Sequence, residues 1–363
     1  MDVFITGTGW ITPLGTGLEE VWKGIVAGTR APVRELAGPG GRRGHFAATV
    51  NPKLVDAVGR NPRLRRSSNI SLFAAAAGLT ALGDAGLEAL GGAGLEALGG
   101  GGLGRCAVVV SVSDGGVIYT RKFYDQVVRE GAGSPLLFPE TVYNAPASHV
   151  AALLGLDGVT YTLVGDASAG LAAVNLGVEL LESGQVDHCL VIGAEEADWI
   201  LGEAYRQWRL CSAAPEVEIG SNRGTLIADG AAAILLSREG RTRVEAVSGG
   251  VPFFRRSEAG ASLTAALREM PEGVRPSRVI SSANGTFVDV AERTALEAAY
   301  GEYGQIPTVY PKVSLGDAFG ASALMQIICA VQSLRQTPAE PVLVPVIGLN
   351  HQAAAALISV ATE

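Results

Sequence analysis

Short apolar runs rich in Val and Ile alternate with longer segments rich in Ala and Leu along nearly the whole chain. The runs at 106–112 (CAVVVSV) and 188–196 (HCLVIGAEE) have the length and composition of buried strands. The segments at 67–86 and 169–184 carry helical periodicity. Because this alternation recurs in both halves of the chain, the sequence predicts an α/β fold in layers, with buried sheets. The other runs expected to form strands are 2–7, 160–165, 231–237, 243–249, 278–285, 308–313 and 355–362.

The composition agrees with one large domain or two fused halves around a sizeable core, because 48% of the 363 residues are hydrophobic and only 18% are charged. A net charge of −8 argues against binding to nucleic acid. We interpret the basic run Arg63–Arg66 as a solvated loop or a docking patch. The four cysteines are scattered without metal-ligand spacing, so we expect no metal site, and no cofactor. We see no signal peptide and no apolar stretch of about 18 residues, so we expect no membrane insertion and a cytoplasmic location.

Three separated motifs carry a family resemblance. The segment 144–198 begins NAPASHVAALLGLDG, continues through TYTLVGDASAG and ends in SGQVDHCLVIGAEEAD. It resembles the β-ketoacyl synthases of fatty-acid and polyketide assembly, in which a strand leads to a nucleophile elbow and a buried helix. The opening strand, glycine-rich loop and first helix of that family are similar to residues 5–28, and its late lysine motif is similar to residues 310–326. The resemblance therefore covers nearly the whole chain.

The resemblance implies a thiolase-like fold, in which two similar α/β halves stack as five layers (αβαβα). We place the N-terminal half, with its dimerisation elements, at residues 1–200 and the C-terminal half at residues 201–363. Members of this family dimerise through a strand of the N-terminal half. Their chemistry uses a Cys at the start of a buried helix, two His residues that stabilise an enolate, a Lys, and a glycine loop that completes an oxyanion hole.

The position of the family's Cys falls on Ala167, or on Asp166 if the register is shifted by one residue. Neither side chain is a thiol, so the acyl-enzyme of the family cannot form at this position. Ser168 is the nearest hydroxyl, but no neighbouring base is evident. We interpret it as a small residue that allows the helix to pack.

The positions of the two His residues fall on Asn284 and Asp317, while the Lys is kept as Lys312. The downstream Asp289 and Glu292 resemble the family's acidic pair and support this alignment. Asn donates amide hydrogen bonds but carries no charge, and an ionised Asp only accepts them. An aspartate here repels a developing enolate, so we expect Lys312 and Asp317 to form a buried ion pair that makes the vacated site rigid.

The late glycine loop is also changed, because Leu349, Asn350 and His351 stand where the family has small glycines. A lone His such as His351 is more often structural or exposed than a new catalytic base.

These losses resemble the chain-length factor, a partner subunit that lacks the Cys, pairs with a catalytic ketosynthase and shapes the acyl-chain tunnel. In such a heterodimer the bulky residues Ile118, Tyr119 and Phe123 are expected to face the partner's tunnel, or simply to pack in the interface, and an acyl carrier protein is reached through the complex. The usual replacement of the Cys in these partners is Gln, so Ala167 leaves the product class open. Two alternatives remain: a standalone decarboxylase or acyltransferase with a rebuilt site that uses Asp166, Asn284, Lys312 and Asp317, and a pure scaffold subunit.

Overall fold

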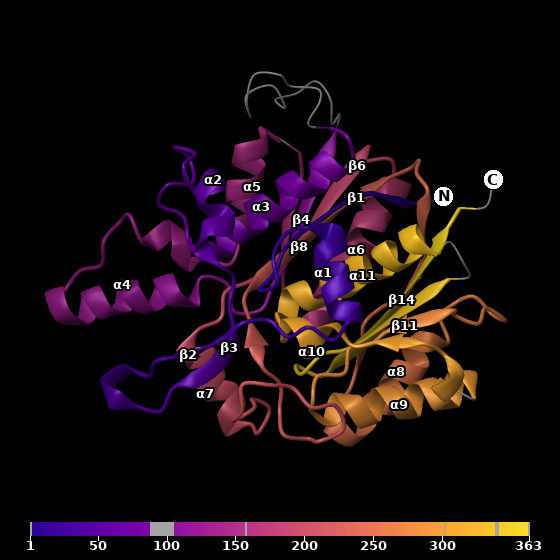
Figure 1. The fold of residues 1–363 in the computed structure, drawn as a ribbon. Coiled ribbons are helices and arrows are strands. Elements are labelled where there is room, and N and C mark those ends of the chain that lie inside the picture. The colour runs from indigo at the N-terminus through magenta and orange to yellow at the C-terminus, as the bar shows by residue number, and fades with distance from the viewer. Residues whose placement is uncertain (1, 88–104, 157, 302, 338–340, 362–363) are drawn as a thin grey trace.

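The computed structural model describes residues 2–87, 105–156, 158–301, 303–337 and 341–361 (Figure 1). One large mixed sheet of eleven strands runs through the molecule, in the order β12-β11-β13-β14-β9-β1-β8-β6-β4-β5, with β10 paired to β14. A smaller sheet has the order β2-β3-β7. The strands are β1 (Phe4–Ile11), β2 (Val33–Leu36), β3 (His45–Ala48), β4 (Cys106–Val112), β5 (Thr160–Val164), β6 (His188–Glu195), β7 (Ile227–Ala228), β8 (Gly230–Ser237), β9 (Thr242–Val247), β10 (Val251–Pro252), β11 (Arg278–Ile280), β12 (Thr308–Val309), β13 (Val342–Ile347) and β14 (Gln352–Val360).

The α-helices are built largely from the Ala- and Leu-rich segments. They are α1 (Leu18–Val26), α2 (Asp56–Gly59), α3 (Asn69–Asp84), α4 (Val117–Glu130), α5 (Ala145–Leu154), α6 (Ala167–Glu182), α7 (Trp199–Gln207), α8 (Ala259–Leu267), α9 (Phe287–Tyr300), α10 (Pro311–Leu315) and α11 (Ser322–Gln336). Each helix in the described part of the chain is too short or too polar to cross a membrane.

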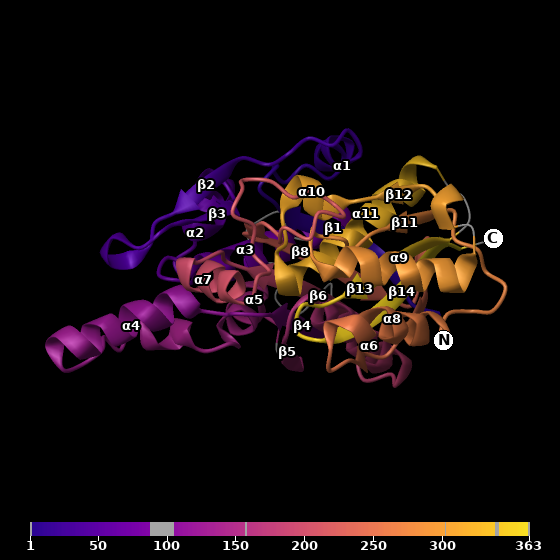
Figure 2. The same ribbon diagram turned by 90° about the horizontal axis from the view of Figure 1, so that it is seen from below.

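The large sheet consists of a first set of five strands, β1-β8-β6-β4-β5, and a second set of six, β12-β11-β13-β14-β9 with β10 on β14. The two sets meet where Phe4 and Ile5 of β1 pair with Arg243 and Thr242 of β9. Helices α3 and α5 pack on the outer face of the first set, and α8 and α9 pack on the outer face of the second. Helices α6 and α11 lie between the two sets, where they contact each other and both sheets (Figures 1 and 2). This order of layers confirms the expected five-layer α/β architecture.

Each helix layer has its own cluster of buried apolar side chains. Close packing explains some of the glycines. A Cβ on Gly7 would lie 2.0 Å from the Ala81 carbonyl oxygen, and one on Gly9 would lie 2.4 Å from the Ala77 carbonyl oxygen, so β1 can approach α3 closely. The central layer is therefore enclosed on both sides, and the start of α6 lies deep inside the molecule.

Helix α4 departs from this compact arrangement, because it projects from the body on the left of both views (Figures 1 and 2). None of its residues is fully buried. Strand β5 pairs only with β4 among the described strands. The first set of strands therefore ends in an open strand edge at β5, and α4 is only loosely packed.

The strands expected from the apolar runs are all present, although β11 and β12 are shorter than their runs. The helices expected at 67–86 and 169–184 correspond to α3 and α6. The division at residue 200 stays a prediction. Strand β8, which follows that residue, pairs with β1 and β6 of the first set.

Candidate functional site

Ala167 is the first residue of α6 and is fully enclosed. The helix begins there because the Asp166 carboxylate caps it, accepting a hydrogen bond from the Ser168 backbone N–H at 3.4 Å. The methyl group of Ala167 therefore lies at the helix end where the family's resemblance places a thiolate. No atom of Ala167 can attack a thioester.

The segment that follows β13 closes over Asp166. The Asn350 backbone N–H donates to Asp166 Oδ2 at 2.7 Å, and the Asn350 amide, with its nitrogen facing the carboxylate, is a further donor. Gly348 is in such close contact that a Cβ added there would lie 2.2 Å from Asp166 Oδ1. Burial raises the pKa of Asp166 to about 6, although the hydrogen bond from Asn350 opposes the shift. The segment 348–351, at the position of the family's glycine loop, is thus hydrogen-bonded to the Asp166 carboxylate.

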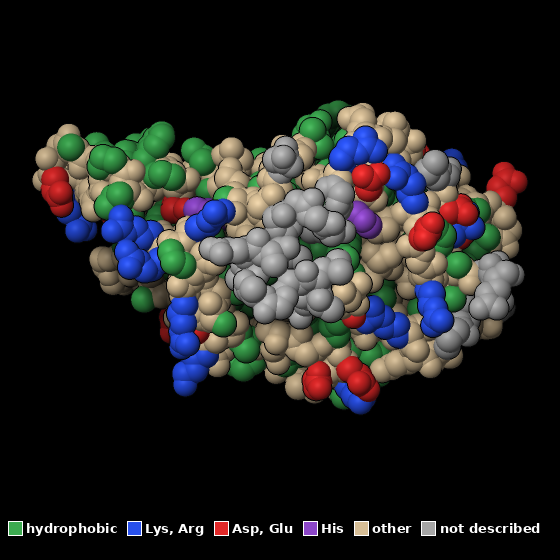
Figure 3. Space-filling view, turned by 90° about the horizontal axis from the view of Figure 1, so that it is seen from above, with side chains coloured by type: hydrophobic (Ala, Val, Ile, Leu, Met, Phe, Trp, Pro, Cys, Tyr) green, Lys and Arg blue, Asp and Glu red, His purple; other side chains and the backbone are tan. Residues whose placement is uncertain are grey.

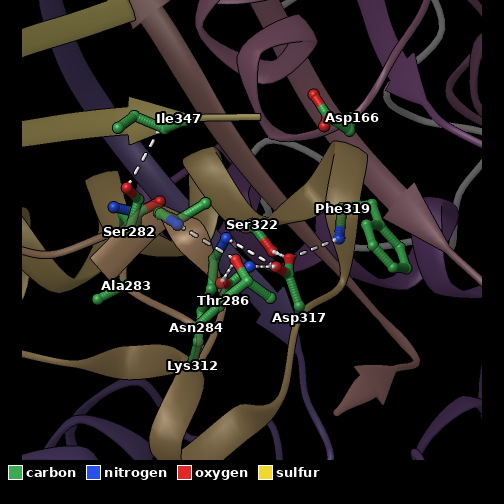
Figure 4. Close-up of polar contacts among 12 residues, drawn as sticks. Asp166, Ser282, Ala283, Asn284, Thr286, Lys312, Asp317, Phe319, Ser322 and Ile347 are labelled. Carbon is green, nitrogen blue, oxygen red and sulfur yellow. Dashed lines mark hydrogen bonds and ion pairs between the residues drawn. The ribbon is translucent and has the colours of Figure 1, made fainter. Parts of the chain in front are cut away.

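Asp317 lies at the centre of a second buried network (Figure 4). Its Oδ2 accepts from Lys312 Nζ at 2.9 Å and from Asn284 Nδ2 at 2.8 Å. Its Oδ1 accepts from Ser322 Oγ at 2.8 Å and from the Phe319 backbone N–H at 3.2 Å. Four donors therefore surround one carboxylate.

The Lys312–Asp317 ion pair expected from the sequence is confirmed. The two side chains are only 3% and 2% exposed. Burial alone would raise the pKa of Asp317, but Lys312 and the hydrogen bonds from Asn284 and Ser322 outweigh it and hold that pKa below its ordinary value of 3.8. Asp317 is thus ionised at neutral pH, and its charge is neutralised by Lys312 inside the protein.

The loop that carries Asn284 is held by the acidic pair of α9. Asp289 accepts from the backbone N–H groups of Asn284 at 2.8 Å and of Gly285 at 3.0 Å. Glu292 accepts from the Ser282 backbone N–H at 2.7 Å. Thr286, which caps α9, donates its hydroxyl to Asn284 Oδ1 at 2.6 Å. Both polar atoms of the Asn284 amide are therefore satisfied, and its orientation is fixed.

The two networks are close enough for their charges to interact, because both Asp317 and Lys312 act on the pKa of Asp166. The structure thus brings together Asp166, Asn284, Lys312 and Asp317, as the alignment with the family requires. In Figure 4 the Asp166 carboxylate lies apart from the hydrogen bonds around Asp317. The site is a pair of satisfied polar clusters in a closed core.

Ser168 and His351 do not supply the missing chemistry. Ser168 Oγ contacts Gln352 Oε1 at 3.1 Å and Asp166 Oδ1 at 3.4 Å, so no imidazole activates it. His351 has a positive φ of 74° and its ring packs against Phe253, with centroids 5.1 Å apart. Within the described residues, no group of three or more His, Cys, Asp or Glu side chains is arranged to hold a metal ion.

The residues expected at the tunnel or interface lie on α4, away from the two clusters. Ile118, Tyr119 and Phe123 are each partly exposed. The Tyr119 hydroxyl donates to the Ser67 carbonyl oxygen at 3.4 Å, and the Phe123 ring packs on Phe138, with centroids 5.7 Å apart. Their role in a tunnel stays a prediction.

Two polar contacts of the site were not expected from the sequence. Ser322 lies five residues after Asp317 at the first turn of α11, a spacing that gave no signal without the structure. Asn350 was noted only as a replacement for glycine, whereas its backbone N–H binds Asp166.

Comparison with known proteins agrees with this geometry. The family model of the beta-ketoacyl synthase N-terminal domain matches residues 1–241. A 3-oxoacyl-[acyl-carrier-protein] synthase 2 of Vibrio cholerae serotype O1 is 24% identical over 92% of this chain and 86% of its own. The structure of the ishigamide ketosynthase/chain length factor matches with a TM-score of 0.82 at 20% identity, covering 99% of both chains. That of a ketosynthase in complex with its chain length factor from Xenorhabdus doucetiae matches with a TM-score of 0.78 at 19% identity, covering 99% of this chain and 98% of that one. By its match to the family model over residues 1–241 and its thiolase-like fold, this chain belongs to the beta-ketoacyl synthase family.

Proposed function

We propose that this chain is a non-condensing subunit, a chain-length factor, that pairs with a catalytic ketosynthase and shapes the acyl-chain tunnel of the pair. The observation that carries the proposal is the buried cluster of Lys312, Asp317 and Asn284, together with Ala167 as the first residue of α6. An enolate needs donors or positive charge at this place, and here the ammonium group and the amide are already bound to a carboxylate. The cluster favours a structural role for these positions over condensation.

The outer surface supports the need for a partner. Large apolar side chains are exposed on α4, on the segment that follows it and on β5. Val128 is 83% exposed and Tyr124 is 62% exposed. Figure 3 shows apolar side chains gathered on the projecting part of the molecule. An apolar surface of this kind typically marks a protein interface, and an open strand edge next to it provides backbone groups for pairing.

The proposed partner is a ketosynthase that retains its Cys and His residues, with an acyl carrier protein delivering substrate to the complex. In this arrangement Ile118 and Phe123 face the partner's tunnel, and their bulk limits how far an acyl chain extends. The ishigamide structure and that from Xenorhabdus doucetiae are each of a ketosynthase with a chain length factor, which is consistent with such a pair.

The test is co-expression with the candidate ketosynthase, followed by native mass spectrometry and product analysis. We expect a 1:1 complex that makes product only when both subunits are present, and longer products from Ile118→Ala and Phe123→Ala. Val26→Ala on α1 is the matched control, because it also removes an exposed apolar side chain, and it should leave product length unchanged. Unchanged lengths in both α4 variants would contradict length control and leave a scaffold role.

The alternative of a standalone enzyme is tested with the purified chain alone. Turnover of a malonyl carrier by the purified chain alone, lost in Lys312→Met, would support a rebuilt active site instead. We expect no turnover, because Asp317 and Asn284 already satisfy each other and Lys312.

A further inference from the structure

Helix α4 is attached to the body by little packing. It contacts mainly the 3-10 helix η5 (Phe138–Thr141), which follows it in the chain, and it contains no fully buried residue. Because burial of an apolar face is what usually fixes a helix on a protein, the direction of α4 must be set by other contacts.

The base of α4 is narrow. The preceding Gly115 has a φ of +58°, and a Cβ on Gly116 would lie 1.9 Å from the carbonyl oxygen of Glu140. The chain thus leaves and re-enters the body at nearly the same point. A helix on such a base is free to tilt unless a contact farther along it prevents the motion.

Besides the long hydrogen bond of 3.4 Å from Tyr119 to the Ser67 carbonyl oxygen, one side chain of α4 provides such a contact. Arg121 forms an ion pair with Asp198, with Nη2 at 3.1 Å from Oδ2, and its Nη1 donates a hydrogen bond to Oδ1 at 3.4 Å. Asp198 is only 5% exposed and also caps α7, accepting from the Ile200 backbone N–H at 2.7 Å. Because both guanidinium nitrogens approach the carboxylate, the ion pair restrains the direction of the Arg121 side chain as well as its distance from Asp198.

The surroundings of Asp198 make the guanidinium group important. The carboxylate of Asp198 acts on Asp114, which lies in the loop just before α4, and burial together with this neighbouring charge raises the pKa of Asp114 to about 6. Asp114 in turn acts on the buried Glu195. Among the described residues, Arg121 is the cation paired with Asp198. Removing it leaves the carboxylates of Asp198 and Asp114 to repel each other at the base of α4.

We propose that the Arg121–Asp198 ion pair is the positioning contact of α4, which holds Ile118 and Phe123 at a fixed reach and so keeps the product length narrowly distributed. The inference rests on the proposed function for its effect on products. Phe123 lies six residues beyond the first residue of α4, which is about 9 Å along the helix axis. A tilt of about 10° therefore moves it by roughly 1.6 Å, close to the length of one carbon–carbon bond, about 1.5 Å.

The first experiment is hydrogen exchange of the amides of residues 117–130 in the full chain. We expect exchange roughly tenfold faster in Arg121→Gln and Asp198→Asn than in wild type, with the midpoint of global unfolding nearly unchanged. Asn is itself a good helix cap, so Asp198→Asn keeps α7. Arg129→Gln is the control, because it removes an exposed arginine from the same helix, and it should exchange like wild type. Exchange in Arg121→Gln that matches this control would overturn the inference.

The second experiment measures product lengths in the complex with the ketosynthase. Arg121→Gln is expected to broaden the distribution to neighbouring lengths, Arg121→Lys to narrow it again, and the double variant Arg121→Gln/Asp198→Asn to add nothing to the single one. A distribution as narrow as that of Arg129→Gln would refute the positioning role. Failure of the proposed function is recognised separately, by unchanged product lengths in Ile118→Ala and Phe123→Ala, while the exchange experiment on the chain alone still tests the anchoring of α4.

Discussion

Replacing Lys312 by Met tests whether the vacated site is held together by its ion pair. Met keeps much of the length of the side chain but removes the ammonium group, so the Asp317 charge remains in a site where it is 2% exposed. Asn284, Ser322 and the Phe319 N–H still donate to that carboxylate, but none of them carries charge. Breaking a buried pair in this way typically costs about 3–5 kcal/mol.

Urea unfolding at pH 7.5 measures this cost, with Lys23→Met as the matched control. Lys23 pairs with Glu19 at 2.7 Å, but both side chains are well exposed, so its loss should hardly move the unfolding midpoint. The loss in Lys312→Met should shrink as the pH falls. With Lys312 gone, the pKa of Asp317 should rise from its lowered value, because only hydrogen bonds such as those from Asn284 and Ser322 then oppose burial, and protonation as the pH falls removes the unpaired charge. If Lys312→Met were no less stable than Lys23→Met at pH 7.5, the pair would not be what holds the site.

Two further predictions concern the closure over Asp166. Burial raises the pKa of Asp166 from 3.8 to about 6, so its contribution to stability is complete below the unfolded pKa and is lost as the pH rises through about 6. Between pH 5 and 7.5 this group should cost the wild type about 1.4 kcal/mol of unfolding free energy, and Asp166→Asn should remove that part of the pH dependence; parallel pH profiles would contradict it. Gly348→Ala places a methyl group against the Asp166 carboxylate and should lose about 1–3 kcal/mol in urea unfolding, whereas the control Gly304→Ala, where a Cβ meets nothing within 4 Å, should lose little.

The layered fold could be predicted from the sequence because its strands are almost continuous apolar runs. Strand β4 (CAVVVSV) is fully buried, and such runs are typical of strands covered on both faces. The ion pair was also predictable, since Lys312 and Asp317 lie five residues apart in a motif that the family brings into its core.

Strand β13 is not among the strands expected from the sequence, and its run VLVPVI has a proline in the middle, which is unusual inside a sheet. The structure explains why it is tolerated. Strand β11 pairs with β13 only at Val342 and Leu343, so no strand partner on that side needs an N–H from Pro345. The Gln326 amide of α11 instead donates to the Pro345 carbonyl oxygen at 3.1 Å. Whether a proline is tolerated here depends on where the pairing with the neighbouring strand β11 ends, and the sequence around Pro345 does not show this.

The contact between Arg121 and Asp198 was likewise beyond sequence reasoning. The two residues are far apart in the chain, and an arginine on a polar helix face is usually solvated. What makes this arginine different is the buried cap of α7 opposite it, which becomes visible only when α4 and α7 are placed in space.

Strand β5 ends the large sheet with a row of backbone groups that face no other described strand, and Tyr161 and Val164 stand exposed along it. Such an edge is a template for adding any extended chain, including misfolded copies of the same protein. We therefore expect the solubility of this protein in a cell to depend on the dose of its partner: synthesised in excess, it should collect in aggregates, and synthesised together with a subunit that covers β5, it should not. Keeping this protein soluble then requires that its partner be translated at a matching rate.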